Sequence, residues 1–291
     1  MATAHHDADV YYVPHHSSWP FVGSIALFVL MIGLVNWFNG SDFSFWIFMA
    51  GAGMLIYTLF RWFGDVIHES EAGKYNGQVD VSFRQGMIWF IFSEVMFFAA
   101  FFGALFYIRV FTLPWISGEG HGALANEFLW NGYVSGWPAN GPQDVGGNFD
   151  IIPPFGLPLL NTIILLTSGL TLTIAHHAMV MGERQKVLLW LGITIALGLT
   201  FFGVQAYEYA FAWNELNLRI YSGIYGATFY LLTGFHGLHV FLGTVMLIVV
   251  WFRVLKGHFT KEKHFGFEAV AWYWHFVDVV WLGLFLFVYV I

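Results

Sequence analysis

Long apolar stretches constrain this chain more than any other feature. A helix that crosses the hydrocarbon core of a bilayer needs about 20 predominantly apolar residues. Seven runs of at least that length, bounded by charges, Gly or Pro, recur along the sequence. The runs are Trp19–Phe38, Phe43–Phe63, Gln85–Leu113, Phe155–Met181, Val187–Tyr209, Ile224–Phe252 and Gly266–Ile291. The pattern predicts seven transmembrane helices, of which the third and sixth are long enough to tilt or to project from the bilayer.

The composition agrees with a membrane protein and excludes several other classes. Hydrophobic residues make up 58% of the chain and charged residues only 10%, whereas a soluble domain carries about 25% charged residues. A net charge of −7 argues against a nucleic-acid partner. The absence of Cys excludes thiolate metal sites, disulfides and cysteine nucleophiles. Residues 1–18 hold no Lys or Arg and do not resemble a signal peptide.

The few basic residues predict the orientation of the chain. Arg109 and Arg219 lie on one side of the predicted membrane. The other nine follow the second, fourth and sixth runs, and they are Arg61, Lys74, Arg84, Arg184, Lys186, Arg253, Lys256, Lys261 and Lys263. Because Lys and Arg concentrate on the inner side of membranes, we expect the N-terminus in the cytoplasm or matrix and the C-terminus outside. The segment 114–154, rich in Gly, Asn and Pro, is then an external loop, expected to have little regular structure.

Ionisable residues inside apolar runs are costly and therefore informative. Glu94 lies about ten residues into the third run, roughly 15 Å along a helix and near mid-membrane. It is either a protonatable functional site or a buried acid that is hydrogen-bonded to a neighbouring helix. His236 and His239 lie three apart in the sixth run, as do His275 and Asp278 in the seventh, so each pair shares a helix face.

These histidines allow two interpretations. Haem ligation needs a His on each of two facing helices, whereas polar side chains inside a membrane bundle also serve as hydrogen bonds between helices. We favour the structural interpretation and expect no metal site and no catalytic centre, because zinc motifs such as HExxH are absent from the sequence. A proton channel through Glu94 is a third possibility. His176 and His177 lie near the inner end of the fourth run.

Polar and aromatic residues also gather at the predicted inner membrane edge. Trp62 and Glu69 close the second run, and Arg253, His258 and His264 follow the sixth. Basic residues at headgroup level can bind lipid phosphates. Ordinary anchoring explains the same residues, and the residue types alone favour it.

Several short strings are more specific than composition. In chain order they read DVIHES (65–70), IFSEVMFF (91–98), LPLLNT (157–162), AHHA (175–178), QAYEY (205–209), FHGLHV (235–240), HFGFEA (264–269) and WYWHFVDVVW (272–281). Together they resemble subunit III of haem–copper cytochrome c oxidase. Accessory subunits of quinol or nitric-oxide-type oxidases remain alternatives, and a haem b electron carrier is a weaker one.

The resemblance implies an architecture and a role. It implies a cytoplasmic segment 1–18, a two-helix bundle 19–63, a cytoplasmic loop 64–84 and a five-helix bundle 85–291, with phospholipid in a V-shaped cleft between the bundles. It implies no haem or copper on this chain, because those cofactors belong to the partner subunits. Catalytic subunit I would be the direct partner and subunit II a member of the same complex. The expected role is to stabilise subunit I and to support its proton uptake.

The resemblance also assigns individual residues. Glu94 matches the family's carbodiimide-reactive carboxyl, and His236, His239, His275 and Asp278 match its intramembrane polar positions. Trp62, Glu69, Arg253, His258 and His264 match positions near bound lipid headgroups. Two features depart from the family: the loop 114–154 is longer, and His5, His6, His15 and His16 have no assigned role. The expected location is the bacterial inner membrane, ahead of the mitochondrial one.

Overall fold

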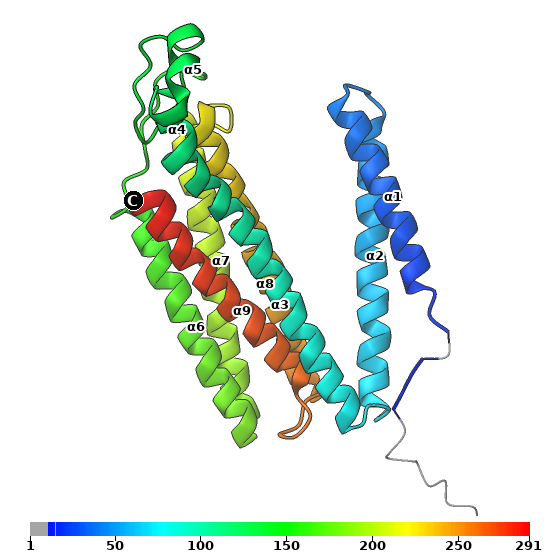
Figure 1. Ribbon diagram of the computed structural model, residues 1–291. Helices are drawn as coiled ribbons and strands as arrows, with labels where there is room; N and C mark the ends of the chain where they lie inside the picture. Colours follow the sequence, from blue (N-terminus) through cyan, green and yellow to red (C-terminus); the bar gives the residue numbers. More distant parts are fainter. Residues whose placement is uncertain (1–10, 15) are drawn as a thin grey trace, which may run out of the picture. The chain divides into compact units, whose positions relative to one another are not determined.

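The computed structural model describes residues 11–14 and 16–291, and this part of the chain is helical with no strand. The expectations for residues 1–10 and His15 lie outside it. Within the described residues, seven helices are long and apolar enough to cross a membrane, which confirms the predicted all-helical, seven-span class (Figure 1). They are α1 (Trp19–Phe38), α2 (Ser44–Glu71), α3 (Gly77–Tyr107), α6 (Leu157–Met181), α7 (Arg184–Asn214), α8 (Gly223–Lys256) and α9 (Phe265–Leu284).

Several helices continue beyond the apolar runs that predicted them. α2 extends past Phe63 to Glu71 and α3 begins at Gly77, so most of the segment 64–84, expected to be a loop, is helical. α3 also continues through η1 (Ile108–Thr112) and α4 (Leu113–Ile116), and α9 continues through η3 (Phe285–Val290). Hydropathy marks the part of a helix that lies in hydrocarbon. Outside the hydrocarbon, a helix can carry charged side chains into water without a penalty.

The chain divides into two compact units, Met1–Gln85 and Gly86–Ile291, each described by itself. In the first unit α1 packs against α2 through small residues. A Cβ atom at Gly33 would overlap the backbone of Phe48, and one at Gly51 would overlap the backbone of Leu30. Such close approach of two backbones is how membrane helices gain packing contacts when lipid is as apolar as their side chains.

In the second unit α6, α7, α8 and α9 form a ring, in which each helix packs against the next and α9 returns to α6. Large aromatic side chains fill the middle, among them the fully buried Trp274 and Trp281. Gly198 and Gly243 make room for the Trp274 indole, since a Cβ at either position would meet its ring. α3 reaches this ring through aromatic contacts such as Phe98 with Phe276, whose centroids are 6.1 Å apart.

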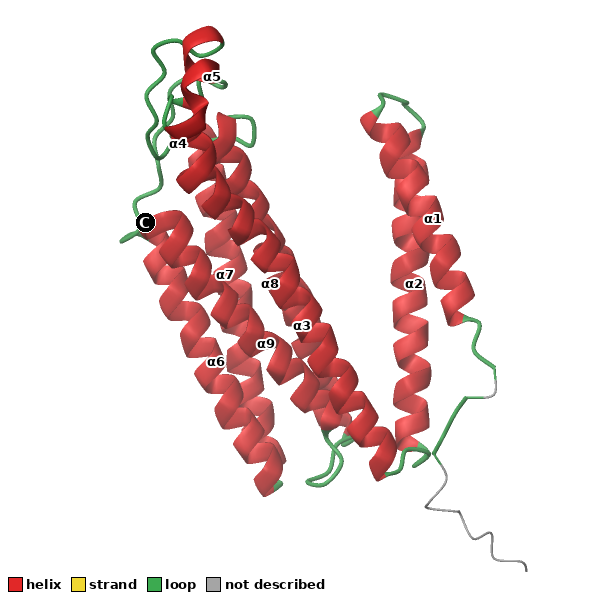
Figure 2. Cartoon of the chain, in the orientation of Figure 1, coloured by secondary structure: helices red, strands yellow, loops and turns green. Residues whose placement is uncertain are grey.

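The connection between the third and fourth spans is more ordered than the sequence suggested. It contains the short helices η2 (Gly120–Gly122) and α5 (Ala123–Phe128) within irregular segments (Figure 2). The Asn126 amide donates to the carbonyls of Ile116, Trp130 and Tyr133 and thereby closes this turn on itself. Asn217, beyond the end of α7, donates to the carbonyl of Asn148. The loop is therefore tied both to itself and to the segment that joins α7 and α8.

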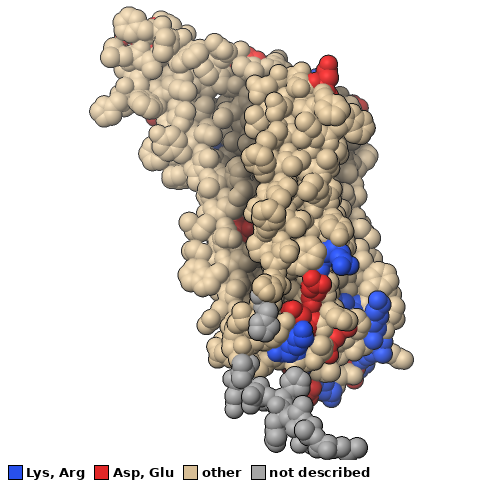
Figure 3. Space-filling view, turned by 90° about the vertical axis from the view of Figure 1, so that its right-hand side faces the viewer, with Lys and Arg blue, Asp and Glu red and all other residues tan. Residues whose placement is uncertain are grey.

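Charge is unevenly spread over the surface. Figure 3 shows a face that is mostly free of charged side chains, with the Lys and Arg side chains gathered toward its lower end. Within the second unit, Arg184 at the start of α7 binds the carbonyls of Val254 and Leu255 at the end of α8. This cation thus adds a charged donor to the carbonyl groups at the end of α8, where the Val254 carbonyl also accepts from the Gly257 N–H.

Candidate functional site

The predicted intramembrane acid lies in a defined pair within the second unit. Glu94 on α3 and His239 on α8 meet with Oε2 and Nε2 3.0 Å apart. The other ring nitrogen of His239, Nδ1, is 2.6 Å from the carbonyl oxygen of Phe235. Because a carbonyl only accepts, Nδ1 carries a hydrogen. The 3.0 Å contact then has one hydrogen between Nε2 and the carboxyl group, and this hydrogen bond joins α3 to α8.

Aromatic rings enclose this pair. Phe98 meets the His239 ring edge-on at 4.9 Å, and Tyr273 stacks on it at 6.3 Å. His239 is buried, and Glu94 is partly buried. Both nitrogens of His239 are engaged in hydrogen bonds, so neither is open as a haem ligand in this arrangement. This geometry favours the structural interpretation of His239 over the haem interpretation.

His275 and Asp278 on α9 form the second predicted pair, with Nδ1 and Oδ2 3.4 Å apart. The Nε2 atom of His275 lies 3.3 Å from the hydroxyl oxygen of Thr173 on α6. Asp278 is buried against α6 at Gly169. A Cβ atom at Gly169 would collide with the Asp278 carboxylate. The pair therefore connects α9 to α6 and depends on that glycine.

His236 has a different environment from the other four predicted intramembrane residues. It is fully buried, and neither of its ring nitrogens has a hydrogen-bond partner among the residues that the structure describes. Its ring packs against Trp281 at 5.1 Å and Phe201 at 5.8 Å. The structure thus does not join the predicted intramembrane residues into one network: it forms two separate pairs and leaves His236 in an aromatic pocket.

A further buried polar group was missed by the sequence reasoning. Tyr289 donates to Glu208 at 2.6 Å, Gln205 donates to the same carboxyl oxygen at 3.3 Å, and Asn161 donates to Gln205 at 3.4 Å. Glu208 is fully buried. The signal was present, because Glu208 lies in the QAYEY string. The apolar run ended at Tyr209, however, and so placed this acid at the membrane edge, whereas α7 continues to Asn214.

The residues predicted at the inner membrane edge lie in both units. In the first unit Glu69 accepts hydrogen bonds from Tyr12 and Tyr75, each 2.8 Å long. Burial, the Glu69 hydrogen bond and the Glu69 charge raise the pKa of Tyr75 above its ordinary value. Trp62 is exposed and stacks on Phe63. The Glu69 carboxylate is therefore held in place by two tyrosines.

The remaining three lie at the end of α8 and the start of α9. The Arg253 guanidinium lies over the Phe259 ring at 4.3 Å. His258 follows α8 directly, after Gly257. His264 is buried, unlike a residue that faces a headgroup, and its Nε2 lies 3.1 Å from the Glu268 carboxylate. His264 thus points into the protein.

Fold and site define a multi-pass helical membrane protein whose buried acids are bound to partners on other helices or on the same one. The sequence matches the family described as Cytochrome c oxidase subunit III over residues 9–114 and 135–291. Of the unmatched residues, 115–134 lie within the loop 114–154 that was predicted to depart from the family, and 1–8 include His5 and His6.

Curated relatives agree with the family match. Proteins described as Cytochrome c oxidase subunit 3 from Damaliscus lunatus and Antilope cervicapra are 40% and 41% identical over 285 residues. The one from Tragelaphus oryx is 40% identical over the same length. In each case 98% of both chains is covered. The chain therefore belongs to the cytochrome c oxidase subunit III family, as the short strings indicated.

Proposed function

We propose that this chain is the accessory, non-redox subunit of an aerobic respiratory cytochrome c oxidase. The observation that carries the proposal is the family match over nearly the whole chain, together with relatives named as subunit 3 of that enzyme. In the complex, the chain covers one flank of catalytic subunit I, with subunit II present in the same assembly. Haem and copper belong to the partner subunits, which carry out electron transfer to oxygen.

The exposed apolar faces support a role in lipid and partner contact. In the membrane windows of α1, α2 and α3, only 11% of residues are buried within the chain. In a bilayer such faces are covered either by lipid tails or by other helices. We assign the faces of α3 and of the α1–α2 pair to structural phospholipids and to subunit I.

Headgroup recognition is assigned to the inner membrane edge. Trp62 supplies an interfacial indole, and Arg253 supplies a charge-assisted donor for phosphate. Glu69, fixed by its two tyrosines, is suited to an ammonium or hydroxyl group of a headgroup. His258 completes the set. His264 is buried against Glu268, so it is not assigned a direct headgroup contact.

The Glu94–His239 pair is assigned to helix packing, because its hydrogen bond joins α3 to α8. Support of proton uptake by the catalytic subunit is assigned to the chain as a whole. The proposed orientation places the N-terminus in the cytoplasm and the C-terminus outside, because nine of 11 basic residues follow the second, fourth and sixth apolar runs. The proposed location is a bacterial inner membrane.

Deletion of the chain tests the proposal. An oxidase purified from the deletion strain is expected to begin turnover at a normal rate and then to lose activity early, because the flank of the catalytic subunit and its lipids are unprotected. Oxygen consumption over many turnovers measures this. An oxidase as durable as the wild type would contradict the accessory role.

The purified chain, freed of other subunits, is expected to show no Soret absorbance. A band equivalent to one haem per chain would contradict the non-redox role.

Two substitutions separate the assigned roles. Glu94→Gln keeps the size of the side chain and removes its charge, and reconstituted oxidase carrying it is expected to pump protons with unchanged stoichiometry. Lost pumping would favour the channel alternative.

Arg253→Gln is expected to lower the number of phospholipids that co-purify with the complex, as measured by mass spectrometry. Arg219→Gln, at the opposite membrane edge, is the matched control and should leave the inner-edge lipids in place.

A further inference from the structure

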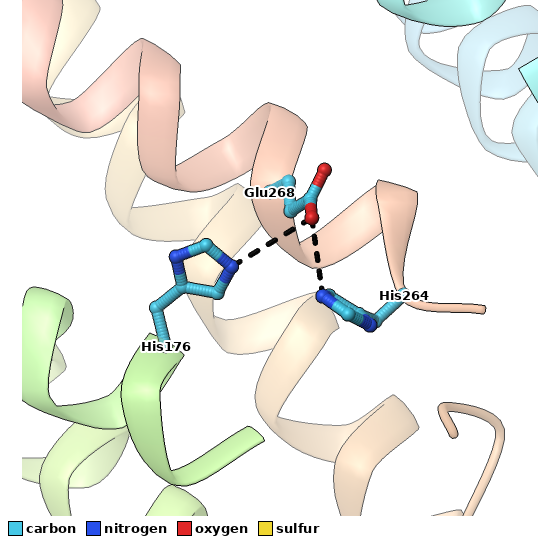
Figure 4. A group of neighbouring side chains, drawn as sticks. All are labelled: His176, His264 and Glu268. Carbon is cyan, nitrogen blue, oxygen red and sulfur yellow. Dashed lines mark ion pairs between the residues drawn. The ribbon is translucent and has the colours of Figure 1, made fainter. Parts of the chain in front are cut away.

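A third titratable side chain, His176, meets the His264–Glu268 pair already described. His176 lies in the last turns of α6, His264 immediately precedes α9, and Glu268 lies in the first turn of α9. Figure 4 shows both imidazoles directed at the same carboxylate. The Glu268 Oε1 atom is 3.1 Å from Nε2 of His264 and 3.8 Å from Nε2 of His176. All three possible ligand atoms lie within 4.8 Å of one another.

The two rings are oriented by contacts on their far sides. Nδ1 of His264 lies 3.1 Å from the carbonyl oxygen of Thr260, which can only accept. In the neutral ring this leaves the lone pair on Nε2, the atom that faces Glu268. A backbone carbonyl that fixes the tautomer in this way is a regular companion of metal-binding histidines. The His176 ring stacks on Phe267 with centroids 5.7 Å apart, which limits its rotation.

The cluster is also partly shielded from solvent. His264 is buried, the side chain of Glu268 is 13% exposed and that of His176 is 33% exposed. A carboxylate and two imidazoles so placed present three electron pairs to one small volume.

We propose that His176, His264 and Glu268 form a binding site for a zinc ion, held by two imidazole nitrogens and one carboxylate oxygen, with a water molecule in the fourth position. Two nitrogens in a set of three favour zinc over magnesium or calcium, which take oxygen ligands. Tetrahedral zinc with bonds of about 2.0–2.2 Å holds its ligand atoms roughly 3.4 Å apart. The widest separation therefore has to close by at most about 1.4 Å, which small side-chain rotations achieve.

The sequence could not predict this site. His264 and Glu268 are four residues apart on one helix face, but His176 is 88 residues from His264 in the chain. No local motif of known spacing links them, which is why the sequence led us to expect no metal. The bound ion would tie the inner end of α6 to the start of α9. This inference does not depend on the proposed function.

Equilibrium dialysis with zinc alone tests the site. The full chain, purified in mild detergent with the subunits that accompany it, is first treated with a chelator and then titrated with isotopically labelled zinc. We expect His264→Gln and Glu268→Gln each to weaken the binding of one ion per chain by at least about 100-fold, because loss of a residue that only hydrogen-bonds to a metal ligand already costs about 10–100-fold. His177→Gln is the matched control, because His177 is the next residue and is exposed. It should keep the wild-type affinity.

Three outcomes would overturn the proposal. The first is wild-type zinc affinity in both Gln variants. The second is loss of the ion when the N-terminal His5, His6, His15 and His16 are replaced by Gln, because binding would then belong to that segment. The third is a zinc coordination shell without imidazole in X-ray absorption spectra of the wild-type complex, a measurement that needs no variant to fold. The proposal predicts two imidazole nitrogens and one carboxylate oxygen.

Discussion

The α1–α2 pair and the α6–α9 ring both hold apolar helices together, but with opposite kinds of packing. In the pair, 11% of the residues in each membrane window are buried, whereas the figure is 56% for the α9 span. The buried residues of the pair are small, as at Gly33 and Gly51. The ring instead buries tryptophans, whose indoles donate to hydroxyls on α6, as Trp274 does to Ser168 at 2.9 Å.

The difference follows from the solvent. Lipid tails are as apolar as Leu, so burial by itself does not drive membrane helices together. A pair of helices gains most from close backbone approach, which requires small residues. A ring of four helices encloses a volume that must be filled, and it places polar groups where only other helices can satisfy them. The pair should therefore be sensitive to added atoms, and the ring to removed ones.

The largest expected effect is a cavity in the ring. Trp274→Ala removes a fully buried indole and should lower the free energy of unfolding by about 3–5 kcal/mol. The measurement is unfolding of the full chain in mixed micelles of increasing SDS fraction. Trp89→Ala, at an exposed position on α3, is the control and should change little. Equal losses for the two variants would mean that the ring is not a packed core.

Added atoms provide the corresponding test of the pair. Gly51→Val places a side chain against the backbone of Leu30 and should cost about 1–3 kcal/mol. Gly53→Val is the matched control, since nothing lies within 4 Å of a Cβ at that position. The chain has no Cys, so one introduced pair across α1 and α2 can report their contact by cross-linking. Efficient cross-linking in the Gly51 variant would refute close packing.

A third prediction concerns pH and the edge of the first unit. Tyr75→Phe removes a hydrogen bond to Glu69 and should cost about 1 kcal/mol at pH 7. The pKa of Tyr75 is raised in the folded state, so its contribution is complete below the unfolded pKa of about 10 and is lost as pH rises through the folded value. The difference in thermal midpoint between wild type and variant should therefore shrink above pH 10. Tyr11→Phe, at an exposed tyrosine, should show no such change.

The smallest expected effect is a single hydrogen bond in the ring. Ser168→Ala leaves the Trp274 indole without its acceptor and should cost about 0.6 kcal/mol, the average for such bonds between membrane helices. The same SDS unfolding measures it. Thr200→Ala is the control, because Thr200 is exposed and its hydroxyl donates only to the carbonyl of Ala196 within its own helix. A Ser168 loss above 3 kcal/mol would show that hydrogen bonds, more than volume, hold the ring together.

Much of the fold could be predicted because hydropathy responds directly to the bilayer. The fourth run was predicted from Phe155 to Met181, and α6 extends from Leu157 to Met181. The predicted helix ends were less accurate where a helix leaves the hydrocarbon, as when α2 continues past Phe63 to Glu71. There the helix is continued by backbone hydrogen bonds and water-exposed side chains, which carry no apolar signal.

The candidate site was predictable in part. Glu94 was identified by its cost inside the membrane, and its partner His239 was named separately, but no spacing could join α3 to α8. Glu208 was missed because the apolar run ended beside it. The edge residue His264 was expected to face lipid, yet it is buried next to Glu268.

The sequence by itself determined that the chain has seven helices able to cross a membrane, which family it belongs to, and that ionisable groups such as Glu94 and Asp278 lie inside apolar runs. Those properties depend on residue type and local order, because each helix must satisfy its own backbone before it meets another. Only the tertiary structure decided which groups meet: Glu94 with His239, Asp278 with the space at Gly169, and His176 with His264 and Glu268. Such pairings depend on the rotation and depth of whole helices, and these are fixed by packing across the bundle.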